Sequence, residues 1–180
     1  IHIIYLDARD DIMIRDIDHI LIARGAISDR VRALGEAITE HLEEVDAEQE
    51  IVLVAVMTGS LIFVADLMRH LPMKIRIQLV TASSYIGEST ASNNNPSIGE
   101  LPDVKGRHVL LVDDILDSGK TLTRIRSELE LLKPQSIQSC VLLRKKLPSA
   151  MEVPCEYVGF EIEDEFVVGY GLDFDGYYRN

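Results

Sequence analysis

Two strand-length runs of apolar residues constrain the fold of this chain more than any other feature. They are IVLVAVM at 51–57 and HVLLV at 108–112, and both are almost free of polar residues. Continuous apolar strands are typical of a parallel sheet that is covered on both faces. Further strands are predicted for IRIQLVTAS at 75–83, SIQSCVLLR at 136–144, YVGFEI at 157–162 and FVVGYGL at 166–172.

Helical spacing alternates with these runs. Ser28 can cap a helix over 29–44, and Asp29 is favourable in its first turn. Helices are also predicted for LIFVADLMRHL at 61–71 and LTRIRSELELL at 122–132. Residues 1–25 are too ambiguous to assign. The alternation of strand and helix predicts an α/β fold with a largely parallel, doubly wound sheet.

Composition excludes several classes of function. The chain has 180 residues, which fits one domain, and its formal net charge is −12. A nucleic-acid-binding surface would need a basic stripe, so we expect no nucleic-acid partner. An acidic protein can still bind a phosphorylated small molecule locally. The longest uncharged run, 51–65, is too short to span a bilayer, so no membrane partner is expected.

The cysteines and histidines carry no metal motif in the sequence. Cys140 and Cys155 lie outside any CxxC pattern, which argues against a disulfide framework or a zinc site and fits a reducing cytoplasm. The histidines are scattered, and surface or core positions explain them better than ligation does: His2, His19, His41, His70 and His108.

Three acids follow the strand at 108–112. Asp113 and Asp114 come directly after it, and Asp117 precedes a Ser-Gly-Lys-Thr turn over 118–121 that runs into a helix. A nucleotide-triphosphate P-loop is excluded because position 114 is not glycine. Amides at a helix N-terminus can bind a phosphate monoester, and the paired acids can bind sugar hydroxyls or Mg²⁺. Helix capping explains Asp117 alone but not all three acids.

Three loops that follow strands should meet at one edge of the sheet, because ligands bind beyond the carboxyl ends of parallel strands. They span 57–60, 83–106 and 113–121. The loop at 84–106 is long and rich in Ser, Asn, Gly and Pro, which is typical of a lid or of a disordered segment.

These motifs resemble those of a known family. VLLVDDILDSGKTL resembles the phosphoribosyl-pyrophosphate motif of type I phosphoribosyltransferases. VAVMTGSLIFVADLMR, TASSYIGEST and VGFEIEDEFVVGYGLDFDGYYRN resemble the pyrophosphate loop, mobile loop and purine-binding hood of the hypoxanthine-guanine branch. The resemblance implies a single domain over 1–180, with a core at about 28–147 and a hood from about 148–180 and part of 1–27.

The resemblance also implies the reaction. A 6-oxopurine displaces pyrophosphate from phosphoribosyl pyrophosphate with Mg²⁺ as cofactor, in a homodimer or homotetramer. The bond at the Thr58 position is typically cis. The resemblance implies that Asp113 and Asp114 bind the ribose and a metal ion, that Asp117 is the catalytic base, and that the 5′-phosphate is bound by Ser118, Gly119, Lys120 and Thr121. It implies that pyrophosphate is bound by Thr58, Gly59 and Arg179, and that Ser84 and Tyr85 belong to the lid. It also implies that the purine is bound by Lys145, Phe166 and Val167, and that Asp173 binds a second metal ion.

The chain departs from the family pattern at several positions. Position 58 is commonly Lys or Arg and the first acid of the pair is commonly Glu, whereas this chain has Thr58 and Asp113. These departures leave open a low-activity, nucleotide-sensing paralogue. A xanthine- or adenine-directed transferase is a second alternative, which a panel of purines would test.

Overall fold

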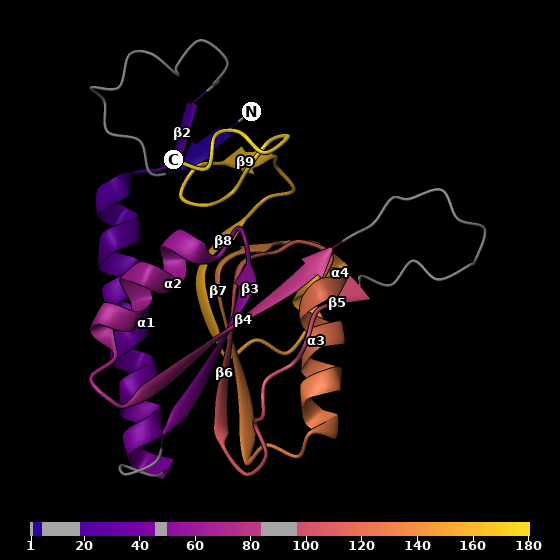
Figure 1. The fold of residues 1–180 in the computed structure, drawn as a ribbon. Helices are drawn as coiled ribbons and strands as arrows, with labels where there is room; N and C mark the ends of the chain where they lie inside the picture. Colours follow the sequence, from indigo (N-terminus) through magenta and orange to yellow (C-terminus); the bar gives the residue numbers. More distant parts are fainter. Residues whose placement is uncertain (1, 5–18, 46–49, 84–96) are drawn as a thin grey trace, which may run out of the picture.

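The main sheet runs through the centre of the molecule. The computed structural model describes residues 2–4, 19–45, 50–83 and 97–180. Six strands lie in the order β5-β4-β3-β6-β7-β8 (Figure 1). All neighbours are parallel except β4 and β5. The strands are β3 (Ile51–Met57), β4 (Ile75–Ser83), β5 (Ser97–Ile98), β6 (His108–Leu116), β7 (Ser136–Lys145) and β8 (Tyr157–Ile162).

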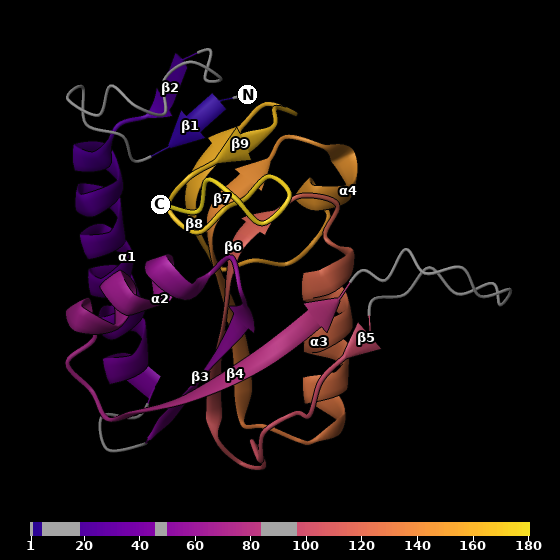
Figure 2. The same cartoon turned by 45° about the horizontal axis from the view of Figure 1, so that its top comes forward.

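Helices cover both faces of this sheet (Figures 1 and 2). Alternate residues of β3 enter two different cores: Leu53 lies in the core that includes α1 and α2, and Val54 lies in the core that includes α3. The predicted doubly wound α/β fold is therefore confirmed. No helix in the described ranges is long and apolar enough to cross a membrane. The helices are α1 (Arg24–Val45), α2 (Leu61–Leu67) continued by a 3-10 turn (Met68–His70), α3 (Lys120–Leu131) and α4 (Pro148–Met151).

Helix α1 begins earlier than predicted. It starts at Arg24, so Ser28 lies inside it and does not cap it. The reason is that the apolar spacing extends back to Ile27, which is fully buried and whose amide donates to the carbonyl of Ala23 at 3.1 Å.

The strand predicted at 166–172 is much shorter in the structure. Only β9 (Val167–Val168) is extended. Gly169, Tyr170 and Gly171 follow with φ angles of 92°, 51° and 107°, and three successive positive values are incompatible with a strand.

A second, three-stranded sheet joins the two ends of the described chain. Its order is β2-β1-β9, with β1 (His2–Ile4) in the centre and β2 (His19–Ile22) beside it. Both pairings are parallel. This small sheet lies beyond the carboxyl ends of the parallel strands (Figure 2), where ligands of such sheets bind.

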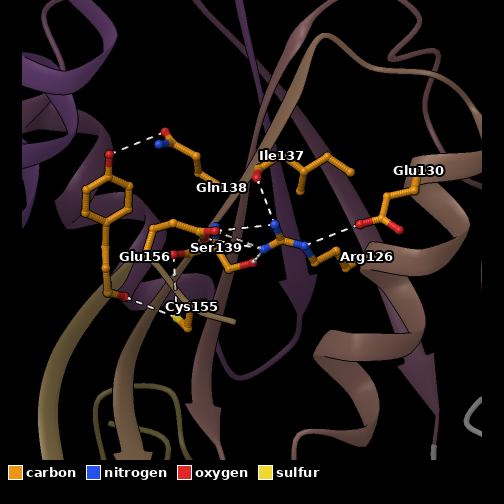
Figure 3. Close-up of polar contacts among 8 residues, drawn as sticks. Arg126, Glu130, Ile137, Gln138, Ser139, Cys155 and Glu156 are labelled. Atoms are coloured by element: carbon orange, nitrogen blue, oxygen red, sulfur yellow. Dashed lines mark hydrogen bonds and ion pairs between the residues drawn. The ribbon is translucent and has the colours of Figure 1, made fainter. Parts of the chain in front are cut away.

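Arg126 on α3 forms hydrogen bonds with two residues of β7 (Figure 3). Its guanidinium donates to the hydroxyl of Ser139 and the carbonyl of Ile137, both at 3.2 Å, and pairs with Glu156 at 3.3 Å. Beside it, the Cys155 thiol donates to two backbone carbonyls, and burial raises its pKa to about 11. The contacts of Arg126 hold the middle of α3 against β7, and they thereby fix the position of its first turn.

We predict that Gly159→Ala lowers the free energy of unfolding by about 1–3 kcal/mol, the usual cost of overpacking. A Cβ at Gly159 would overlap the carbonyl oxygen of Leu142 on the neighbouring strand β7. Gly25→Ala is the matched control, because a Cβ there meets nothing within 4 Å and alanine favours a helix. Thermal unfolding should show a lower Tm for Gly159→Ala and an unchanged or higher one for Gly25→Ala. Equal values would contradict the packing of β7 against β8.

Candidate functional site

A cavity of about 410 Å³ opens at the carboxyl ends of β3 and β6. It brings together two of the three loops that the sequence placed there, 57–60 and 113–121. Of the third loop, residues 84–96, including Ser84 and Tyr85, lie outside the described residues, whereas residues 97–106 begin with β5, which returns along β4. The lining residues are Val56, Met57, Gly59, Asp113, Asp114, Ile115, Leu116, Asp117, Ser118, Gly119, Thr121 and Leu122.

The cavity lies where β6 extends beyond its pairing with β3. We predicted that β6 would end before Asp113, but it continues to Leu116 along β7. On its other side, the pairing with β3 ends at Ala55 and Val112. The acids therefore lie on a strand whose β3 side is open. The peptide bond between Met57 and Thr58 is cis, as the resemblance implied.

Asp113 and Asp114 form an adjacent pair of carboxyls, of which Asp113 is buried and Asp114 is partly buried. Asp113 is only 6% exposed, and one of its oxygens accepts a hydrogen bond from the amide of Asp114 at 2.9 Å. Burial, followed by the neighbouring charge of Asp114, raises the pKa of Asp113 well above its ordinary value. Burial also raises the pKa of Asp114. Two adjacent carboxyls that disfavour ionisation fit a hard divalent cation, which takes oxygen ligands and stabilises the charged form.

Two glycines allow three loops to meet beside this pair. A Cβ on Gly59 would overlap the carboxylate of Asp114, and a Cβ on Gly171 would overlap the carbonyl oxygen of Gly59. Sequence reasoning gave Gly59 a backbone role but missed Gly171. Its signal was present, since glycines at 169 and 171 interrupt an apolar run.

Arg179 and Asp173 interact with each other. Arg179 donates to the carbonyl of Gly171 at 2.6 Å and pairs with Asp173 at 2.9 Å, and the other Asp173 oxygen accepts the amide of Gly176 at 2.8 Å. Neither side chain lines the cavity. In this structure both hold the C-terminal loop together, and the charge of Arg179 acts to lower the pKa of Asp114.

Lys145 connects the cavity to the hood. Its ammonium lies 3.2 Å from Asp117 and 2.9 Å from Asp164, and its side chain is 12% exposed. Burial lowers the pKa of Lys145, but the hydrogen bonds to Asp164 and Asp117 outweigh burial and leave it raised. Sequence reasoning missed Asp164, which is one of three acids in the turn after β8.

An aromatic pair stands on the hood. Phe166 is 50% exposed and Phe174 is 49% exposed, and their rings meet edge to face with centroids 5.7 Å apart. Such exposure leaves a ring face free to stack on a planar ligand. Val167 and Tyr170 are buried. Phe174 was not predicted from the sequence.

The turn before α3 has the features of a phosphate site. Gly119 caps the helix in the left-handed region with φ of 80°, and it packs against Val153. The first amides of a helix have no partner within it and attract anions. Ser118 and Lys120 are exposed and Thr121 is partly buried, so their polar groups can contact such a ligand.

Known proteins share this sequence and fold. The model of the phosphoribosyl transferase domain family matches residues 24–175. A hypoxanthine phosphoribosyltransferase from Haemophilus influenzae is 40% identical over 162 residues, 89% of this chain and 90% of the relative. A hypoxanthine-guanine-xanthine phosphoribosyltransferase from Tritrichomonas foetus is 34% identical and covers 93% of this chain and 90% of its own length. A solved hypoxanthine-guanine phosphoribosyltransferase from Bacillus anthracis has a TM-score of 0.75 at 35% identity, covering 89% and 92% of the two chains.

We predict that Asp113→Asn stabilises the metal-free protein. Because the pKa of Asp113 is raised in the folded state, folded protein retains a proton that the unfolded chain loses as pH rises above the ordinary value of 3.8. Wild-type stability therefore falls with rising pH, and asparagine removes this loss. In metal-free buffer the variant should gain Tm, at about 2–4 °C per kcal/mol, and the gain should widen with pH.

The matched control for this prediction is Asp103→Asn, because Asp103 is exposed. Its Tm should follow that of wild type across the same pH series. A loss of stability in Asp113→Asn, or a gain independent of pH, would contradict the claim that ionisation of the Asp113 carboxyl lowers the stability of the folded protein.

Proposed function

Since the chain belongs to the phosphoribosyltransferase family, we propose that it transfers the 5-phosphoribosyl group from phosphoribosyl pyrophosphate to N9 of hypoxanthine or guanine. The products are the nucleoside monophosphate and pyrophosphate, so the enzyme acts in purine salvage. The observation that carries the proposal is the cavity that joins the buried acid pair to the phosphate-type turn, with Lys145 beside it.

The sugar phosphate fits along the loop at 113–121. The turn from Ser118 to Thr121 binds the 5′-phosphate through backbone amides and hydroxyls. Asp113 and Asp114 hold the ribose hydroxyls and Mg²⁺, whose charge stabilises the pyrophosphate leaving group. Thr58 and Gly59, across the cavity, offer backbone donors to the pyrophosphate.

The purine fits between the cavity and the hood. Phe166 stacks on the base and the backbone of Val167 meets its edge. Asp117 acts as the base at the purine N7 or its proton. Lys145 donates a hydrogen bond to the exocyclic oxygen of the purine, because an ammonium has donors only. Its position 3.2 Å from Asp117 supports a site that handles both the proton and the oxygen of the base.

The remaining assignments are extensions of this proposal. Arg179 and Asp173 contribute to pyrophosphate and to a second metal only if their mutual ion pair opens. The loop at 84–106, with Ser84 and Tyr85, closes over the reaction. A homodimer or homotetramer and a cytoplasmic location stay predictions.

Pyrophosphate release tests the function. The protein is mixed with phosphoribosyl pyrophosphate, Mg²⁺ and hypoxanthine, guanine, xanthine or adenine in turn. We expect release with hypoxanthine or guanine, and none after a chelator removes the metal. Xanthine deserves its place because the Tritrichomonas foetus relative is named for it. No release with any purine would favour the nucleotide-sensing alternative, and release without metal would overturn the mechanism.

We predict that Asp117→Asn lowers kcat by about 10²–10⁴, the usual contribution of a general acid or base. The change is nearly isosteric, and the side chain is 58% exposed, so the fold should survive. Glu163→Gln is the control, since Glu163 pairs with Lys146 on the surface. If kcat of Asp117→Asn stays within a few-fold of wild type, Asp117 only orients Lys145.

We predict that the enzyme prefers 6-oxopurines to adenine by about 10²–10³ in kcat/KM, and that Lys145 causes the preference. A site built to donate one hydrogen bond can reject the analogue that cannot accept it by up to about 10⁴–10⁵. We expect less here because lysine is flexible and water can enter the pocket. Lys145→Gln should reduce the ratio of kcat/KM for hypoxanthine to kcat/KM for adenine, because the glutamine amide can either donate or accept a hydrogen bond.

Lys146→Gln is the matched control, because Lys146 pairs with Glu163 rather than with the acids at the cavity. Steady-state kinetics with hypoxanthine and adenine decide the question. A wild type that uses both equally would exclude the oxopurine assignment. An unchanged preference in Lys145→Gln would move the discriminating role to another residue.

A further inference from the structure

Three potential metal ligands meet on the small sheet, away from the cavity. His2 lies on β1, His19 on β2, and Glu165 two residues before β9. His2 and His19 are register partners, although 17 positions separate them in the sequence. The three residues each offer a ligand atom, and these atoms lie within 4.8 Å of one another.

The two imidazoles are unusually close. Their Nδ1 atoms are 3.1 Å apart, and their ring centroids are 4.2 Å apart with the planes tilted by 57°. Two nitrogens bound to one tetrahedral ion at about 2.0–2.1 Å lie about 3.3 Å apart. A hydrogen bond between two neutral imidazoles would give the same separation, so this distance alone does not identify a metal site.

Glu165 distinguishes these two explanations. Its Oε2 atom is buried and, among the described residues, has no hydrogen-bond partner. It lies 3.8 Å from Nε2 of His2, beyond hydrogen-bonding distance. A buried carboxylate oxygen without a partner is costly. The two close approaches involve different nitrogens of His2, Nδ1 towards His19 and Nε2 towards Glu165. After a turn of the exposed His19 ring, a cation between the three side chains would bind this oxygen and one nitrogen of each imidazole.

We propose that His2, His19 and Glu165 bind one divalent transition-metal ion of the Zn²⁺ class. Two imidazoles and one carboxylate are a ligand set that suits Zn²⁺, Ni²⁺ or Cu²⁺, whereas Mg²⁺ prefers oxygen ligands alone. His19 is exposed, so its ring can turn to complete the coordination, and water takes the remaining position. This ion is therefore different in kind from the one expected at Asp113 and Asp114.

The ion would join the three strands of the small sheet. Each ligand comes from a different part of the chain, and the two end strands of this sheet do not contact each other directly. The amide of His2 also donates to the carbonyl of Phe166 at 3.0 Å. Binding therefore fixes the segment that carries Phe166 to both N-terminal strands, and it should stabilise the folded protein because the unfolded chain lacks the assembled site.

Isothermal titration calorimetry with Zn²⁺ in excess Mg²⁺ tests the proposal. The excess Mg²⁺ occupies the oxygen-rich cavity, so only a nitrogen-containing site should respond. We expect one Zn²⁺ per chain for wild type and for His41→Gln, whose imidazole is exposed on α1. His19→Gln and Glu165→Gln should each weaken binding by at least about 10–100-fold, because both are direct ligands and this is the loss found when only a group that supports a ligand is removed.

Thermal unfolding gives a second readout. Zn²⁺ should raise the Tm of wild type and of His41→Gln, and should leave the Tm of His19→Gln unchanged. Because His19 is exposed, this variant should fold even if Glu165→Gln does not. The absence of Zn²⁺ binding in excess Mg²⁺, or equal binding by wild type and His19→Gln, would overturn the proposal.

Discussion

The burial of two adjacent carboxyls at the end of β6 is the constraint on which the candidate site depends. Asp113 and Asp114 have raised pKa values because the surrounding sheet excludes water. Few sequences can accommodate such a pair. The strand must extend beyond its pairing with β3. Gly59 must lack a side chain so that its loop reaches the Asp114 carboxylate, and Gly171 must lack one so that its loop packs on the carbonyl of Gly59. This is the pattern expected where stability is lost locally for function.

Three ion pairs join the end of β7 to β8 and to the turn that leads into the hood. Three successive cations at and just past the end of β7 face one acid on β8 and two acids after it: Arg144 pairs with Glu161, Lys145 with Asp164 and Lys146 with Glu163. An exposed pair such as that of Lys146 and Glu163 contributes little to stability. The middle pair differs from both others because the ammonium of Lys145 also reaches Asp117, at 3.2 Å. The pair with Asp164 positions the ammonium of Lys145 between the hood and the cavity.

Sequence reasoning succeeded where one local pattern decides the structure. The strand at 51–57 was predicted with its observed bounds because its apolar run is continuous and both of its faces are buried. The loops at 57–60 and 113–121 were predicted to meet because parallel strands end at one edge. Sequence reasoning missed the features that depend on contacts between segments far apart in the chain. The parallel pairing of β1 with β2 and β9, and the approach of Asp164 to Lys145, leave no periodic signal in the chain.

The most direct test of the account is the titration of the Asp113 carboxyl itself. Carbon-13 NMR of labelled aspartates, assigned with Asp113→Asn, would follow this group in metal-free protein and in the presence of Mg²⁺ and phosphoribosyl pyrophosphate. We predict a pKa well above 3.8 in metal-free protein, and a marked decrease when metal and substrate bind. An ordinary pKa that neither metal nor substrate changes would contradict the claim that this buried pair is the metal and sugar site.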